Sequence, residues 1–123
     1  MSDETDQLPH ILCEALLSRA RFNEPDLTLR QFAVLLLVYH TAEPQTVSGL
    51  ARYLELTGST VTRVLNRLED LKLACREINR LDSRSMVVER TTGGTVMMQR
   101  LKGAMTEASD RAVGLQSSRS TTE

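Results

Sequence analysis

The residues best suited to chemistry in this chain are hydroxyl, amide and guanidinium side chains spaced along one short segment. Ser59, Arg63 and Asn66 fall on one side of a helix at about 100° per residue, flanked by Thr62 and Arg67. Arginine can pair with guanine, asparagine with adenine, and serine or threonine with phosphate oxygens. The spacing therefore indicates a surface that binds nucleic acid. The solvent-exposed face of an ordinary amphipathic helix would, however, show the same residue types.

A second polar group lies between two short predicted strands at residues 74–78 and 86–90. Arg80 and Arg84 stand at or near the tip of this hairpin. An arginine there can enter the narrow minor groove of DNA, where negative potential is concentrated. We expect Asp82 to lie close enough to Arg84 to orient it. A basic hairpin directly after two short helices is a wing, and it favours DNA binding over a merely solvated face.

Three local elements must position the first group. Residues 46–54 predict a short helix, residues 56–58 a turn, and residues 59–68 a second helix, for which Thr57 is a candidate N-cap. Small Ala51 stands where the two helices would cross closely. The second helix has a buried stripe at helical spacing, consisting of Val61, Val64, Leu65 and Leu68. This pattern is moderately specific for a helix-turn-helix.

The flanking segments predict three further helices and two loose ends. Residues 1–7 are expected to form a loose acidic arm, and residues 7–22 a first helix with a stripe of Leu, Ile and Ala. Thr28 and Gln31 form a capping box for a helix over 29–40, the expected centre of the core.

A last helix is predicted to begin after Thr91, with the stripe Met97, Leu101, Ala104, Met105, Ala108 and Ala112. No later element covers this stripe, so we expect it to pack on a second subunit. The tail, residues 117–123, is expected to be disordered.

Over residues 8–112 the chain resembles the MarR family of winged-helix bacterial transcriptional regulators. The matching pieces are Leu27–Phe32, Thr46-Val47-Ser48, Leu50-Ala51, Ser59-Thr60-Val61-Thr62-Arg63, Arg67-Leu68-Glu69, Asp82-Ser83-Arg84-Ser85, Thr91 and Gly94. The resemblance implies a mainly α fold with a small β-hairpin wing: a winged helix-turn-helix flanked by N- and C-terminal dimerisation helices. It also implies DNA contacts from Ser59, Thr60, Thr62, Arg63, Asn66, Arg67, Arg80 and Arg84.

We expect a single domain over residues 1–123. Its parts are an arm and dimerisation helix at 1–24, the winged helix-turn-helix at 27–92, a dimerisation helix at 93–116 and the tail at 117–123. The chain departs from the family pattern in a shorter connection between its first two helices and in a single last helix. Four residues also differ from the usual types: Gly49 stands where a capping Glu is common, Glu55 and Lys72 stand where Gly is common, and Arg90 replaces an apolar residue.

Composition sets further bounds. The chain has 123 residues, 41% of them hydrophobic, and no apolar run approaches the length of about 20 that spans a membrane. The acidic N-terminus lacks the order of a signal peptide, so we expect a cytoplasmic protein. The net charge is −1, but residues 48–90 hold eight basic side chains against six acidic ones. This small basic excess coincides with the proposed binding segment.

Other candidate sites are weaker. Cys13 occupies the position where peroxide-sensing members of the family hold a reactive cysteine, but Leu17 stands where those sensors have a tyrosine. A semi-buried inert thiol is the main alternative. His10 and His40 lack neighbours at metal-ligand spacing, so no metal site is expected. No phosphate loop, elbow serine or paired carboxylates indicate an enzyme or a cofactor.

We therefore expect a homodimeric regulator that binds double-stranded DNA in a sequence-specific way, acting as a repressor. The predicted helix at residues 59–68 would be the recognition helix and enter the major groove. The wing would enter the minor groove. The alternatives are a winged-helix module that binds proteins rather than DNA, and a redox-sensing regulator acting through Cys13. The effector, if it is a small molecule, is not identified by the sequence.

Overall fold

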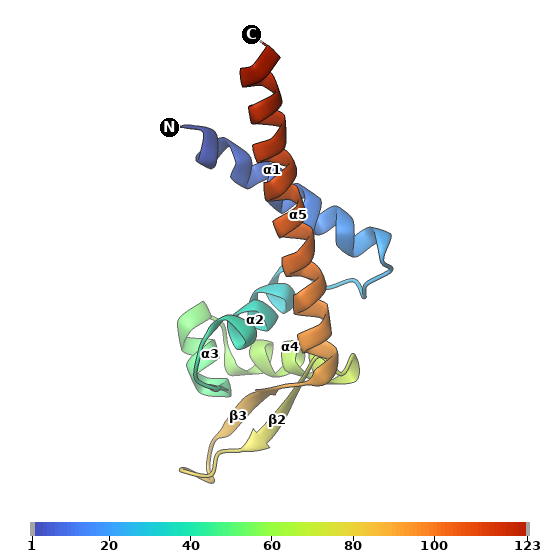
Figure 1. Ribbon diagram of the computed structural model, residues 1–123. Helices are drawn as coiled ribbons and strands as arrows, with labels where there is room; N and C mark the ends of the chain where they lie inside the picture. Colours follow the sequence, from blue (N-terminus) through green and yellow to red (C-terminus); the bar gives the residue numbers. More distant parts are fainter. Residues whose placement is uncertain (1, 123) are drawn as a thin grey trace. The chain divides into compact units, whose positions relative to one another are not determined.

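The computed structural model describes residues 2–122, with side chains described over residues 7–111, and it is drawn in Figure 1. The chain divides into two compact units. Asp26–Met97 form one unit, and Met1–Pro25 with Met98–Glu123 form the other. The single predicted domain therefore consists of two units, and each is described by itself.

Three helices build the core of the unit Asp26–Met97: α2 (Leu29–His40), α3 (Val47–Leu54) and α4 (Gly58–Asp70). Helix α2 begins with the predicted capping box, in which Thr28 and Gln31 exchange hydrogen bonds between side chain and backbone. The core residues share almost complete burial: Val34, Leu35, Leu50, Val61, Leu65, Leu68, Val88 and Met97. Helix α4 thus inserts the predicted stripe between α2, α3 and the sheet.

A small antiparallel sheet completes this unit, with strand order β1-β3-β2. Strands β2 (Ala74–Ile78) and β3 (Met86–Arg90) match the two predicted strands and form the wing below the helices in Figure 1. The third strand, β1 (Gln45–Thr46), was not predicted, because two residues are too few to show alternation. It pairs with β3 and fixes the start of α3 against the wing.

Left-handed backbone conformations end the helices of the motif without glycine. Glu55 closes α3 at φ 55° and ψ 43°, and Lys72 follows α4 at φ 61°. These are the two positions where the sequence departs from the glycine usual in the family. The turn geometry is therefore retained, and Glu55 and Lys72 are strained because each has a side chain in the left-handed region.

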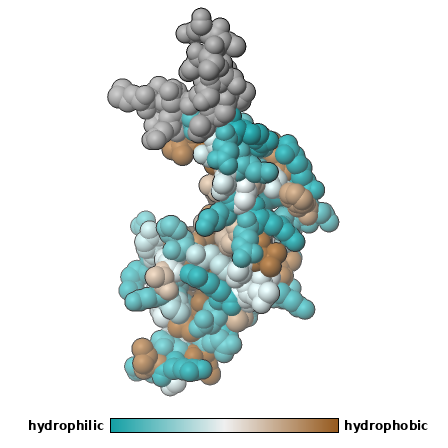
Figure 2. All heavy atoms as spheres, in the orientation of Figure 1, coloured by the Kyte–Doolittle hydropathy of each residue, from teal (hydrophilic) through white to brown (hydrophobic). Residues whose placement is uncertain are grey.

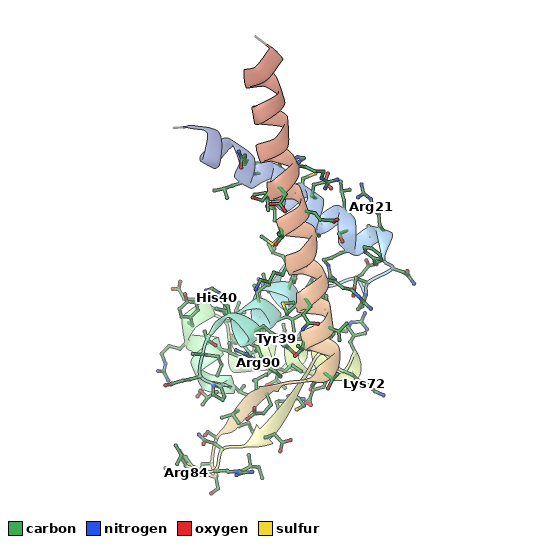
Figure 3. All side chains as sticks on the ribbon, in the orientation of Figure 1. Arg21, Tyr39, His40, Lys72, Arg84 and Arg90 are labelled. Carbon is green, nitrogen blue, oxygen red and sulfur yellow. The ribbon has the colours of Figure 1, made fainter. Side chains whose placement is uncertain are left out.

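Tyr39 joins α2 to the strands and to the start of α5 (Thr92–Thr122). Its hydroxyl donates to the carbonyl oxygen of Leu73 at 2.8 Å and accepts from the Thr91 N–H at 3.0 Å. Arg90 lies beside the Tyr39 ring and donates to the Val38 carbonyl, at the C-terminal end of α2 (Figure 3). The unusual arginine is therefore a helix cap, since cations are favourable at that end of a helix.

The other unit consists of α1 (Ser2–Arg21) and the rest of α5. Ala15 and Ala108 are both buried, and Glu14 pairs with Arg111 at 3.1 Å, so the two helices cross at small residues. Glu24 also pairs with Arg100 at 2.8 Å. The predicted apolar stripe of α5 is partly covered, with Ala108 buried and Met105 39% exposed, while the side chain of Ala112 lies outside the described residues.

Two predicted loose ends are corrected by the helix bounds. The predicted arm at residues 1–7 falls almost wholly within α1, which begins at Ser2, and the predicted tail falls within α5, which runs to Thr122. Both segments are polar and lack the apolar periodicity on which the prediction relied. Neither segment contains proline or glycine, so nothing in their backbone chemistry stops a helix that has already formed.

Candidate nucleic-acid interface

Helix α4 turns most of the predicted DNA-contacting residues outward. Its buried side is closed by the predicted stripe, so Ser59, Thr62, Arg63, Asn66 and Arg67 are all exposed on the other side. Within the described side chains, neither Arg63 nor Arg67 takes part in an ion pair. Both guanidinium groups are therefore available to a ligand.

Thr57 is the N-cap of α4, as predicted. Its hydroxyl accepts from the Thr60 N–H at 3.2 Å and donates to the Thr60 hydroxyl at 2.9 Å. Thr60 is half-buried, so it is held by the cap more than the neighbouring Ser59 and Thr62. The remaining N–H groups at this helix start would suit a phosphate oxygen.

The wing tip presents Arg84 in a fixed orientation. Its Nε donates to Asp82 Oδ1 at 3.2 Å, and its backbone N–H donates to the same oxygen at 3.1 Å. The side chain is nonetheless 90% exposed and extends from the end of the wing (Figure 3). The predicted Asp82–Arg84 contact is present, and it orients the arginine without covering it. Arg80 is exposed on the same turn.

An open groove of about 440 Å³ separates the start of α4 from the wing. It is lined by Val47, Ser48, Gly58, Thr62, Arg76, Arg84, Ser85 and Met86. Arg76 and Arg84 from the wing and the Thr62 hydroxyl from α4 thus face one concave surface. Arg76 is paired with Glu69, whereas the Arg84 side chain stays 90% exposed beside Asp82, so Arg84 is the cation at this surface that suits a polyanion.

Sequence reasoning missed Arg76. This residue lies in β2, half-buried, and it donates from Nε to Glu69 and from Nη2 to Asn66. Asn66, which was predicted to contact DNA, is therefore tied to the wing. Glu69 and Arg76 are seven residues apart and on different elements, so only the packing of β2 on α4 could reveal the contact. In the sequence, the one sign of this contact was an arginine inside a predicted strand.

The cysteines and histidines form no combined site among the described residues, where no cluster of His, Cys, Asp and Glu suits a metal. Cys13 is exposed on α1, and its proposed redox role stays a prediction. Partial burial raises the pKa of the Cys75 thiol, and Glu77, Glu69 and Glu89 raise it further. Cys75 is thus less ionised than an ordinary thiol, which makes it a poor nucleophile.

The fold and the exposed face of α4 define a winged helix-turn-helix protein. Residues 26–85 match the model of the MarR family. Over these residues the chain therefore matches the winged helix-turn-helix of the MarR family, as the sequence resemblance implied. A comparison with curated proteins gives no match. Within the described residues, no helix has the length and apolar character needed to cross a bilayer.

Solved structures support this assignment. A variant of S. aureus MepR bound to an oligodeoxyribonucleotide is 25% identical, with a TM-score of 0.69 over 85% of this chain and 74% of that one. MepR bound to ethidium bromide is 26% identical, with a TM-score of 0.69 and the same coverage. The transcriptional regulator Tm0710 from Thermotoga maritima is 21% identical, with a TM-score of 0.73 over 91% of this chain and 79% of that one. The similarity to Tm0710 shows a shared fold.

Proposed function

We propose that this protein is a cytoplasmic bacterial regulator that binds double-stranded DNA as a homodimer and represses transcription by occupying its site. In each subunit α4 enters the major groove and the wing contacts the adjacent minor groove. Ser59, Thr62, Arg63, Asn66 and Arg67 act from α4, with Thr60 beside the cap, and Arg80 and Arg84 act from the wing. No step of this function requires catalysis.

The observation that carries the proposal is the pairing of uncommitted arginines on α4 with an oriented arginine on the wing. Among the described side chains, Arg63 and Arg67 are exposed and take part in no ion pair, and Asp82 holds Arg84 outward. A merely solvated polar face has no reason to show this combination on both the helix and the wing. The MepR variant bound to an oligodeoxyribonucleotide shows that a similar winged helix binds DNA.

Exposed leucines support the homodimer. Leu8, Leu12 and Leu16 are spaced four residues apart on α1, and they are 61%, 58% and 48% exposed in the single chain. Leucines at this spacing form one helix face, which water solvates poorly. A second copy of the same unit would cover this face, and it would place two copies of α4 on one duplex.

The test is selection of bound duplexes from a random pool, followed by affinity measurements over a salt series. Two sets of Arg63, Arg67, Arg80 and Arg84 near phosphates should displace on the order of 4–8 counterions, so affinity should fall steeply with salt. Failure to enrich any sequence, or a salt slope near zero, would rule out this function. A protein-binding winged helix would give that negative result and still fold.

A small-molecule effector is part of the proposal, since MepR has been solved with ethidium bromide. Ethidium is therefore a suitable first probe: it should lower the affinity of the protein for its selected duplex. Because ethidium also binds DNA directly, the measurement should be its binding to the protein alone, followed by anisotropy of the protein bound to a labelled duplex. Ethidium without effect would leave the DNA function in place and exclude ethidium as an effector.

A further inference from the structure

Arg76 connects the wing to the recognition helix through both ends of its guanidinium group. Nε lies 2.7 Å from Glu69 Oε1, and Nη2 lies 2.5 Å from Asn66 Oδ1. The Arg76 and Glu69 side chains are 22% and 30% exposed, so the group is partly shielded from water. Within β2, Arg76 pairs with the buried Val88 of β3, which fixes the strand position from which it reaches α4.

This contact determines which part of the Asn66 amide is free. Asparagine reads adenine with both groups at once: Oδ1 accepts from the base and Nδ2 donates to it. Here a cation already holds Oδ1 and turns it toward the wing. Oδ1 keeps a second lone pair but is oriented by Arg76, so the group free to turn toward a base is the Nδ2 donor, which suits the acceptor atoms of guanine or thymine in the major groove.

We propose that Arg76 is a specificity-determining residue that acts through Asn66, making Asn66 present a donor and disfavour adenine at one base pair of each half-site. The inference rests on the proposed DNA binding. Arg76 is thus a positioning residue, and the base preference at one position depends on a residue outside the recognition helix.

The experiment measures binding of the full-length protein and its variants to the selected duplex and to all single-base variants of it. Asn66→Ala identifies the base pair that Asn66 reads, as the position where its preference is lost. At that pair, Arg76→Ala should shift the preference toward adenine by about fivefold or more, since a bidentate contact can then form. In the Asn66→Ala background, Arg76→Ala should cause no further change in preference at that pair.

Two further variants separate this role from a structural one. Asn66→Asp keeps an oxygen for Arg76 but presents an acceptor instead of a donor, so the preference should move to cytosine or adenine, which offer amino groups. Arg67→Ala is the matched control: it removes an exposed arginine next to Asn66 in sequence, and it should weaken binding equally on every duplex.

The outcomes are distinguishable from failure of DNA binding itself. If the wild-type protein enriches no duplex, the proposed function fails. If it binds but Asn66→Ala changes no base preference, or Arg76→Ala lowers affinity equally on all duplexes, the inference about Arg76 is overturned and DNA binding stands. Circular dichroism of each variant confirms that the helices are retained.

Discussion

Arg63 and Arg84 are positioned by different elements, and this separates what each can contribute to DNA binding. Arg63 lies on the second turn of α4, opposite the buried Val61 and Val64. Arg84 lies on a turn at the end of the wing, where Asp82 orients it. A helix in the major groove meets base edges that differ for every base pair, whereas the minor groove distinguishes A·T from G·C and little more.

Removing each of the two arginines should therefore have a different kind of effect on DNA binding. Arg63→Ala should cost about 1–3 kcal/mol of binding and relax the base preference within each half-site. Arg84→Ala should weaken binding with little effect there, and its penalty should vary with the A·T content of the flanks. Binding of both variants to single-base and flank variants of the selected duplex decides this. A loss for Arg63→Ala that is uniform over the panel would mean that this arginine contacts only phosphate.

Glu55 provides a test of backbone strain at a single residue. Because its φ is 55°, glycine should be tolerated there at least as well as glutamate, and Glu55→Gly should be neutral or stabilising by up to about 1 kcal/mol. The matched control is Arg52→Gly, an exposed residue within α3, where glycine should destabilise by about 0.5–1 kcal/mol. Chemical denaturation measures both. A clear loss of stability for Glu55→Gly would show that its side chain makes a favourable contact.

These residues show where sequence reasoning succeeds at this scale. Glu55 was predictable, since a turn of known type needs a left-handed residue at a fixed position. The exposure of Arg63 was predictable from the helical period alone. The hydrogen bond between Asn66 and Arg76 was not predictable. The two residues are ten positions apart, and their contact depends on how β2 packs against α4. Local periodicity carries no information about that packing.

At the scale of elements, the start of α5 is held against α2 and β2 by a close approach at Gly94. A Cβ atom at this position would overlap the Tyr39 hydroxyl and the Leu73 carbonyl oxygen. The Gly94 N–H also donates to the Thr91 hydroxyl at 3.0 Å, which makes Thr91 the N-cap of α5, the helix that was predicted to begin after this residue. The strand that forms the wing and the long helix α5 therefore meet at a tightly packed point.

Gly94→Ala should accordingly destabilise the winged-helix unit by about 1–3 kcal/mol through overpacking. Gly103→Ala is the control within the same helix: nothing lies within 4 Å of its added Cβ, so alanine should stabilise by about 0.5–1 kcal/mol. Adding Tyr39→Phe to Gly94→Ala should cost less than the two single losses combined, because one of the clashing atoms is gone. Equal stability of the two glycine variants in thermal denaturation would contradict the close approach.

Elements with strong patterns were predicted well, and weakly patterned ones were not. Both wing strands and α2 have the predicted bounds, because alternation and a capping box each leave a clear signal. The polar first turns of α1 and the end of α5 have no apolar period, so their helices extend past the predicted limits. Likewise, the role of Arg90 at the end of α2 is set by a contact across 52 residues.

At the scale of the whole molecule, apolar side chains are uncovered in both units. Figure 2 shows hydrophobic residues on the surface, and among the described side chains the most exposed large hydrophobic residue is Leu81, which is 97% exposed at the wing turn. The regular spacing on α1 differs from this single leucine, because a row of leucines can pack against a matching helix. In the proposed homodimer, α1 and the adjoining part of α5 would therefore form the subunit contact, and the wing would not.

Leu12→Glu and Met105→Glu should each convert a dimer into a monomer. Both side chains are partly exposed in the single chain, at 58% and 39%, so a carboxylate there is tolerated by the monomer. In a dimer the same carboxylate would be buried without a partner, which is strongly unfavourable. Sedimentation of each variant gives the mass, and circular dichroism shows whether helix content is retained.

Leu81→Glu is the control, since it makes the same change at a more exposed leucine on the wing and should leave the dimer intact. The monomeric variants should also bind the selected duplex weakly, because a single α4 reaches one half-site and loses the gain from simultaneous contact. If Leu12→Glu and Met105→Glu sediment as dimers, these terminal helices do not form the interface. Full affinity in a monomeric variant would instead mean that one subunit is sufficient to recognise the DNA.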